Sequence, residues 1–252
     1  MEVRHLISIE DVSVSWWDDL YQLCCEIIAR PGDFSLSCSG KVMASLFFEP
    51  STRTNFSFQT AMMRLGGDVV GFSEPGATST AKGETLADTI RMMSSYSDAI
   101  VIRSPHEGAA MAASLYSDVP IINAGDGGHF HPTQTLADLA TISQKRGGIH
   151  NLNVGICGDL LNGRTVHSLV LALSKFPSIS FFLISPRELS IPDYMLAHLK
   201  KLNQKYIEIS NLESTLPQLD VLYMTRIQRE RFADPKDYER LKNSYVLNRR
   251  KL

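Results

Sequence analysis

Apolar side chains follow two alternating patterns along the chain. Short runs of consecutive apolar residues predict buried strands, and longer stretches with apolar positions every three or four residues predict helices. The predicted strands cover 42–48, 69–72, 99–102, 120–123, 154–157, 181–184 and 221–224. The predicted helices cover 16–28, 56–65, 86–96, 136–146, 166–173 and 192–203, with an alanine-rich helix between 102 and 120. This alternation predicts an α/β fold of parallel sheets covered by helices.

The pair Gly147-Gly148 is the best candidate for a domain boundary, because the strand–helix rhythm restarts after it. We therefore expect one domain at 1–147 and a second at 148–252. Ligands of such sheets bind at the carboxyl ends of the strands. That rule selects as site loops the segments 49–54, 103–106, 123–134, 158–164 and 225–228.

Composition narrows the class of protein. The chain has 252 residues, of which 44% are hydrophobic and 21% charged, and a net charge of −2. These values are typical of a globular protein and argue against a general nucleic-acid or anionic-membrane binder. No apolar run reaches about 18 residues, and the N-terminus lacks the apolar region of a signal peptide. We expect free thiols in a reducing cytoplasm for Cys24, Cys25, Cys38 and Cys157.

The loop 49–54 places Ser51, Thr52, Arg53 and Thr54 at the start of a predicted helix. Free N–H groups, the helix dipole and a guanidinium converge there, an arrangement that suits a phosphate. Ordinary capping by one hydroxyl is the alternative.

Two further loops carry polar groups. The segment 77–84 contains Lys82, although no phosphate-binding P-loop pattern is present and the segment also reads as a polar surface loop. In the segment 123–134, Pro132 can begin a helix, so His131 and Gln134 lie over its first turn and can bond a small ligand. A structural role for His131, or half of a zinc site with His129, are the alternatives.

The segment 155–165 is a glycine-rich strand-to-helix turn without the spacing of a dinucleotide-binding fingerprint. Arg164 lies at a helix start, where a cation is disfavoured, and a bound carboxylate would relieve this conflict. Arg226 follows the strand 221–224 and reads, taken alone, as a solvated side chain.

Together these loops resemble the aspartate/ornithine carbamoyltransferase superfamily, and within it the aspartate branch. The resemblance covers nearly the whole chain. The motifs, in family order, are FFEPSTRT, RLGGDVVGF, KGETLADT, NAGDG, HPTQTLADL, GDLLNGRTVHSL and YMTRIQRERF. The ornithine branch is the nearest rival, but its HPCQ-type motif is absent.

The resemblance implies two doubly wound parallel-sheet domains, 1–147 for carbamoyl phosphate and 148–252 for aspartate, with the active site between them. It implies transfer of a carbamoyl group to L-aspartate, an early step of pyrimidine synthesis, without cofactor or metal. The carbamoyl phosphate site would comprise Ser51, Thr52, Arg53, Thr54, Arg103, His131 and Gln134. Of these, Thr54, Arg103 and His131 would act on the reacting carbonyl. The aspartate site would comprise Lys82, Arg164, Arg226 and Gln228.

The resemblance also bears on assembly. Lys82 and one hydroxyl among Thr78, Ser79 and Thr80 resemble residues delivered from a neighbouring subunit, which implies a homotrimer. Regulatory chains join such trimers in some organisms. Family members continue for several tens of residues past Leu252, with an HPLP-type loop that contacts carbamoyl phosphate, and we expect that segment to be missing here. A non-catalytic anion-binding or assembly member is the alternative from another class, and a carbamoyltransferase for another amino acid such as ornithine is a further one.

Overall fold

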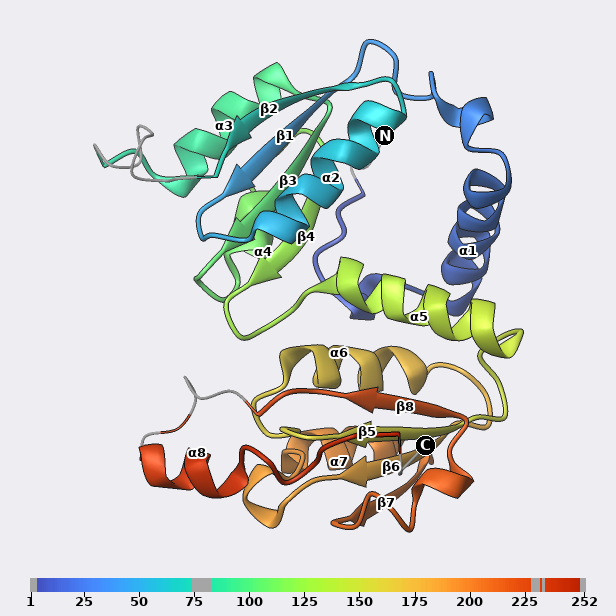
Figure 1. Ribbon diagram of the computed structural model, residues 1–252. Coiled ribbons are helices and arrows are strands. Elements are labelled where there is room, and N and C mark those ends of the chain that lie inside the picture. Colours follow the sequence, from blue (N-terminus) through green and yellow to red (C-terminus); the bar gives the residue numbers. More distant parts are fainter. Residues whose placement is uncertain (1–3, 74–82, 228–231, 233, 250–252) are drawn as a thin grey trace. The chain divides into compact units, whose positions relative to one another are not determined.

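The computed structural model describes residues 4–73, 83–227, 232 and 234–249. The chain divides into two compact units, Met1–Gln134 and Thr135–Leu252, and each carries its own parallel sheet (Figure 1). The two parallel sheets and the helices that connect their strands confirm the predicted α/β class.

The sheet of the first unit has the order β2-β1-β3-β4. Its strands are β1 (Val42–Phe47), β2 (Asp68–Phe72), β3 (Ala99–Ser104) and β4 (Ile121–Asp126). All pairings are parallel, with Met43 opposite Ala99 and Ile100 opposite Ile121. The N-terminal segment continues the sheet beyond β4, since Leu6 forms a parallel bridge with Ile122.

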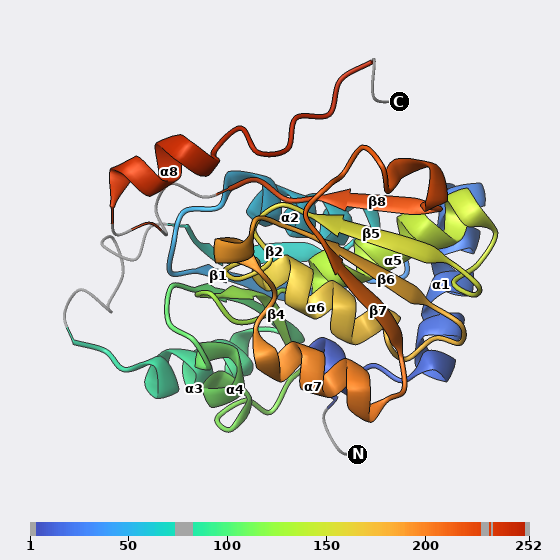
Figure 2. The same ribbon diagram turned by 90° about the horizontal axis from the view of Figure 1, so that it is seen from below.

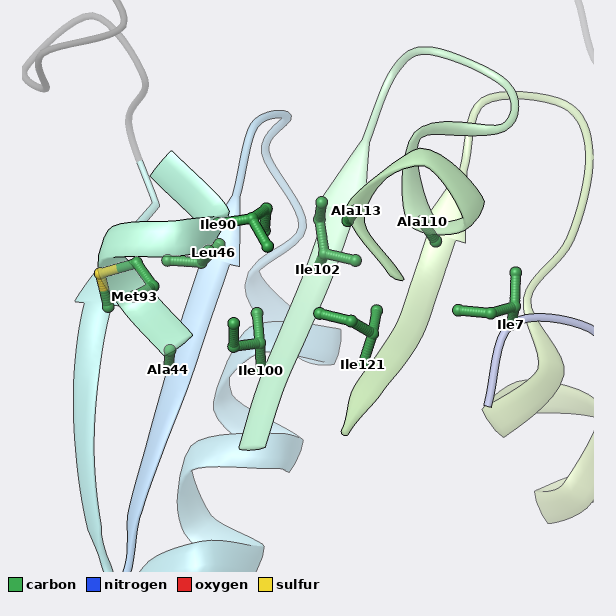
Figure 3. Close-up of a cluster of buried hydrophobic side chains, with 10 residues drawn as sticks. All are labelled: Ile7, Ala44, Leu46, Ile90, Met93, Ile100, Ile102, Ala110, Ala113 and Ile121. Atoms are coloured by element: carbon green, nitrogen blue, oxygen red, sulfur yellow. The ribbon is translucent and has the colours of Figure 1, made fainter. Parts of the chain in front are cut away.

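Alternation along the strands separates the two faces of this sheet. Ala44, Leu46, Ile100, Ile102 and Ile121 point to one face (Figure 3). That face is covered by α3 (Leu86–Tyr96) and α4 (Ala109–Ser114). The intervening residues Met43, Phe47 and Val101 pack with the apolar side of α2 (Thr52–Arg64). Because both faces are covered, the strands read as continuous apolar runs rather than as alternating ones.

Two further helices belong to this part of the chain. Helix α1 (Val14–Ala29) begins at Ser13, whose hydroxyl accepts a hydrogen bond from the backbone N–H of Trp16. Helix α5 (Pro132–Arg146) begins in the first unit and continues into the second. The division between the units thus falls within α5, whereas the sequence places the boundary after that helix, and the limits at 147 and 148 stay a prediction. Short 3₁₀ helices lie at Ile9–Asp11 and Pro31–Phe34.

The sheet of the second unit has the order β7-β6-β5-β8 (Figure 2). Its strands are β5 (Asn153–Cys157), β6 (Ser180–Ile184), β7 (Lys205–Ile209) and β8 (Val221–Met224). Helices α6 (Arg164–Leu173), α7 (Asp193–Lys201) and α8 (Pro235–Leu241) accompany them, with 3₁₀ helices at Arg187–Leu189 and Leu216–Gln218. Cys157, Ile184 and Leu212 form a buried cluster. All four cysteines are free thiols.

Every strand predicted from the sequence overlaps one in the structure. Strand β7 was missed, because at the edge of the sheet its residues are mostly exposed and give no apolar run. Helix α8 was missed because only Leu241 of its seven residues is buried. Among the helices of the described ranges, none has the length and apolar character needed to cross a membrane.

Candidate active site

The strand order of the first unit defines where its ligand site belongs. From β1 the sheet continues to β2 on one side and to β3 on the other. Loops diverge at such a point and leave a crevice at the carboxyl ends of the two strands. The loop 48–51 follows β1, and Arg103, opposite Phe47, lies near the end of β3. Two of the loops selected from the sequence therefore meet at the switch point.

The loop after β1 leads directly into α2. Ser51 is the N-cap residue, but its side chain makes no capping hydrogen bond to the helix backbone. Its hydroxyl instead donates to Oγ1 of Thr54 at 3.0 Å. The alternative of plain capping by Ser51 is therefore wrong, and the N–H groups of the first turn stay available to an anion.

Arg53 is exposed on that first turn. Within the described part of the chain, no carboxylate lies within ion-pair distance of it. Among the described residues, α2 thus carries at its N-terminus a guanidinium with no carboxylate partner, and the helix dipole adds positive potential at the same end.

Arg103 is held from two sides. Its Nη2 lies 2.7 Å from Oε1 of Glu49, with only 12% of the arginine side chain and 26% of the glutamate side chain exposed. Its Nη1 donates to the carbonyl of Ala124 at 3.0 Å. Its Nε is buried and has no hydrogen-bond partner among the residues that the structure describes. A buried donor without a partner is uncommon and is often explained by a function.

Gly125 brings Arg103 and His131 together. Its φ is +119°, and a Cβ built there would lie 2.8 Å from Nη1 of Arg103 and 3.6 Å from Cδ2 of His131. Both side chains thus lie against the same glycine, and a Cβ there would force the Arg103 guanidinium to shift while meeting His131 at ordinary van der Waals distance. Glycine is required here for conformation and for close approach.

A buried polar pair fixes this glycine. Asn123 and Asp126 are 0% and 1% exposed. Oδ1 of Asn123 accepts from the N–H of Gly125 at 2.8 Å, and its Nδ2 donates to Oδ1 of Asp126 and to the carbonyl of Ile7. The Asp126 carboxylate also accepts from the N–H groups of Gly108 and Phe130. The motif NAGDG carried this signal, although its two polar residues were not predicted to be structural supports.

His131 immediately precedes α5 and is 9% exposed. Its Nδ1 lies 3.3 Å from the hydroxyl of Thr133. Gln134 is exposed on the first turn of α5, and its N–H donates to the carbonyl of His131. His129 lies near Asp126, with 3.6 Å from Nδ1 to Oδ2. In the described ranges no three potential ligands of a metal ion are clustered.

A separate cavity of about 460 Å³ lies on the side of the sheet covered by α3 and α4. Its lining comprises Phe48, Leu86, Ser104, Pro105, His106, Glu107, Gly108, Ala109 and Ala112. None of the site residues predicted from the sequence lines this cavity.

The second unit has its switch point between β5 and β8. A Cβ on Gly158, whose φ is +125°, would lie 2.2 Å from the carbonyl oxygen of Thr225, and the N–H of Thr225 donates to the carbonyl of Cys157. The loops that follow the two strands are therefore in contact. One loop leads to Arg164 and the other to Arg226, so the fold gathers the two arginines at one edge.

The loop 158–163 is internally braced. Asp159 is fully buried and accepts from the backbone N–H and from Nδ2 of Asn162. Gly163 is the N-cap residue of α6 and has no side chain that could cap the helix. Arg164 is the first helical residue. Arg164 is half-buried and Arg226 is exposed.

The nearby thiol is inert. Burial raises the pKa of Cys157 to about 12, so this side chain is a neutral thiol at neutral pH and a poor nucleophile.

The structure therefore describes most of the predicted site residues. In the first unit these are Ser51, Thr52, Arg53, Thr54, Arg103, His131 and Gln134, and in the second Arg164 and Arg226. Lys82, Gln228 and the hydroxyls of Thr78, Ser79 and Thr80 lie outside the described residues. Glu49 lies in the selected loop 49–54, but its pairing with Arg103 was not predicted, because nothing in the motif says which cation its carboxylate would meet.

Comparison with family models agrees with this geometry. Residues 4–144 match the carbamoyl-P binding domain of aspartate/ornithine carbamoyltransferases, and residues 150–252 match the Asp/Orn binding domain. The chain belongs to the aspartate/ornithine carbamoyltransferase family.

Within that family the similarity is to the aspartate enzymes. The aspartate carbamoyltransferase catalytic subunit of Clostridium kluyveri is 54% identical over 249 residues, which are 99% of this chain and 81% of that protein. That of Finegoldia magna is 53% identical over 249 residues, with the same coverage of both chains. The solved catalytic subunit of the M. jannaschii enzyme has a TM-score of 0.92 at 46% identity, covering 99% of this chain and 82% of that one. The Trypanosoma cruzi enzyme, solved with carbamoyl phosphate and aspartate, has a TM-score of 0.89 at 35% identity, covering 99% and 81%.

Proposed function

We propose that this chain transfers the carbamoyl group of carbamoyl phosphate to the amine of L-aspartate. The products are N-carbamoyl-L-aspartate and phosphate. The observation that carries the proposal is the placement of Arg103 beside His131, across Gly125, at the switch point of the first sheet. Membership of the family and the similarity to aspartate carbamoyltransferase catalytic subunits support it.

The phosphate group would bind at the N-terminus of α2. A monosubstituted phosphate, as in carbamoyl phosphate, carries about −1.5 to −2 charges near neutral pH. The free N–H groups of the first turn, the hydroxyls of Ser51, Thr52 and Thr54, and the Arg53 guanidinium supply matching donors and charge. Arg103 adds a second guanidinium, whose buried Nε has no hydrogen-bond partner among the described residues.

Carbamoyl transfer needs an uncharged amine to attack the carbamoyl carbon. A C–N bond forms while the carbonyl oxygen gains negative charge, and the C–O bond to phosphate then breaks with its electrons going to phosphate. The proton lost by the amine leaves with phosphate or to solvent. Donors fixed in advance stabilise the oxyanion, and Thr54, Arg103 and His131 fill that role. Holding two small reactants in line lowers the barrier further.

Aspartate would be bound by residues at the switch point of the second sheet. Its two carboxylates match the guanidinium groups of Arg164 and Arg226, because a guanidinium can bond a carboxylate through two N–H groups. Lys82 and Gln228 complete this set in the proposal. Ornithine carries an ammonium group in place of the second carboxylate, so two arginines at this edge favour aspartate over ornithine.

Assembly and location are part of the same proposal. The active form would be a homotrimer in the cytoplasm, acting in pyrimidine biosynthesis, with Lys82 and one hydroxyl of Thr78, Ser79 or Thr80 completing the site of the neighbouring subunit. Refolding a mixture of Arg53→Ala and Lys82→Ala chains tests this sharing. Mixed trimers regain turnover if sites are shared, because some sites then contain both native groups. Mixed trimers that stay as inactive as their parents contradict sharing.

The function itself is tested with ¹³C-labelled carbamoyl phosphate. NMR should detect N-carbamoyl-L-aspartate when L-aspartate is the acceptor, and a much slower reaction with L-ornithine. Faster formation of citrulline would assign the ornithine reaction. Binding of carbamoyl phosphate without any carbamoylated product would favour the non-catalytic anion-binding alternative.

A further inference from the structure

His167 connects α6 and α7 to the loop that precedes Arg164. It lies on α6 one turn after Arg164, and its imidazole bridges two groups. Nε2 is 2.8 Å from the carbonyl oxygen of Leu160, and Nδ1 is 3.0 Å from the hydroxyl of Tyr194 on α7. The Tyr194 ring meets the imidazole edge-on, with centroids 5.9 Å apart.

These contacts fix the tautomer of His167. A carbonyl oxygen only accepts, so Nε2 must carry the hydrogen. In a neutral imidazole Nδ1 is then an acceptor, and the Tyr194 hydroxyl is its donor. Burial lowers the pKa of His167. The side chain is therefore neutral at neutral pH, in the one tautomer that can hold Leu160.

The loop held in this way leads directly to Arg164. The N–H of Leu160 donates to the carbonyl of Leu189 at 3.0 Å, so the N–H and the carbonyl of Leu160 each have a hydrogen-bond partner. Gly163 is packed so closely that a Cβ there would lie 2.6 Å from the carbonyl oxygen of Asp159. Because the hydrogen bonds at Leu160 and the close packing of Gly163 constrain this loop, releasing Leu160 should displace the first residue of α6.

We propose that His167, oriented by Tyr194, is a positioning residue for aspartate: it fixes the carbonyl of Leu160 and thereby holds Arg164 where it meets a substrate carboxylate. This inference rests on the proposed function, since it assumes that Arg164 binds aspartate. It predicts that the imidazole acts on affinity for aspartate while touching no substrate.

A pair of amide substitutions separates the two hydrogen bonds. In His167→Gln the amide nitrogen takes the place of Nε2 and can still donate to Leu160. In His167→Asn it takes the place of Nδ1 instead, so Leu160 is released. We expect His167→Asn to raise the KM for aspartate about tenfold, as the loss of one orienting hydrogen bond implies. We expect His167→Gln to stay within about threefold of the native KM, and Tyr194→Phe to fall between them.

A control variant for loss of stability is available at the other end of α6. Ser174 is 4% exposed, donates to the carbonyl of Leu171 and lies 3.2 Å from Nε2 of His198. Ser174→Ala should lower the thermal midpoint without changing the KM for aspartate. The KM for carbamoyl phosphate serves as the second control and should be unchanged in every variant.

The outcomes separate this inference from the proposed function. Aspartate binding is also measured by calorimetry in inorganic phosphate, which needs no turnover. Native protein that turns over or binds aspartate, with His167→Asn equal to it in affinity, overturns the positioning role alone. The positioning role is also overturned if the Gln and Asn variants raise the KM for aspartate equally and this rise follows the drop in their thermal midpoints. That pattern would indicate a purely structural effect. Native protein that neither binds aspartate nor forms product overturns both.

Discussion

The carboxylate of Glu49 lies 2.7 Å from the guanidinium of Arg103, at the carboxyl ends of two neighbouring strands. The pair neutralises one arginine of the site and also orients it. An anionic ligand at Arg103 must compete with Glu49 for the guanidinium. Glu49 therefore has two opposing effects on an anionic ligand: its charge weakens the attraction, and its bond to Arg103 orients the guanidinium that would bind the ligand.

Glu49→Gln separates these two effects. Removing the negative charge should leave inorganic phosphate bound at least as tightly as in the native protein. Turnover should fall about tenfold, because the guanidinium loses one of its two strong restraints, a charge-assisted hydrogen bond. Calorimetry with phosphate and steady-state kinetics check the two parts. Weaker phosphate binding with unchanged kcat is the opposite pattern and would count against this role.

Gly125→Ala tests the close approach of Arg103 and His131. A methyl group 2.8 Å from Nη1 of Arg103 must displace the guanidinium, and the φ of +119° adds strain of about 1–3 kcal/mol. We expect a loss of kcat of at least about tenfold, together with a lower thermal midpoint. Gly40→Ala is the matched control, because Gly40 has a φ of +73° but no atom within 4 Å of its added Cβ. It should lose stability and keep kcat.

Arg226→Ala should act on aspartate. We expect the KM for aspartate to rise while the affinity for carbamoyl phosphate is nearly unchanged, because Arg226 follows β8 of the second sheet and carbamoyl phosphate is assigned to the first. Losing a hydrogen bond to a charged group costs about 1.5–3 kcal/mol. Substrate titrations measure both quantities. A similar loss of affinity for both substrates would argue against assigning aspartate to the second sheet and carbamoyl phosphate to the first.

The stability of the protein should depend on pH through His167. Burial lowers its pKa below the ordinary 6.5, so the unfolded chain binds a proton more readily than the folded one. Stability from this source is complete above pH 6.5 and declines as the pH falls below that value. The slope is at most about 1.4 kcal/mol per pH unit for one group.

Urea unfolding between pH 5.5 and 7.5 measures this dependence. His167→Gln should flatten the decline. Part of it should persist, because burial also lowers the pKa of His5. An equally steep decline in His167→Gln would assign the dependence to other groups.

The sequence predicts much of this fold because covered parallel strands give apolar runs that local pattern alone reveals. The predicted strand ends also select the loops that contain Arg103 and Arg164, and the roles of these two arginines stay predictions. The side chains that contact these residues could not be predicted. Glu49 and Arg103 are distant in sequence, as are His167 and Tyr194, and periodicity assigns a residue to a face without naming what lies opposite. Gly125 illustrates the same limit: the glycine was visible, but the two side chains packed against it were not.

Carbamoyl transfer to aspartate is best measured by quantifying N-carbamoyl-L-aspartate and phosphate together in one reaction mixture, for the native chain and for Arg53→Ala. We expect equal amounts of the two products, both dependent on L-aspartate. We also expect the variant to lose roughly 10- to 150-fold in kcat/KM, which corresponds to one charge-assisted hydrogen bond of about 1.5–3 kcal/mol. Arg64→Ala, at the opposite end of the same helix, should retain native turnover. Phosphate release without carbamoyl aspartate, or an Arg53→Ala variant with native kcat/KM, would contradict these expectations.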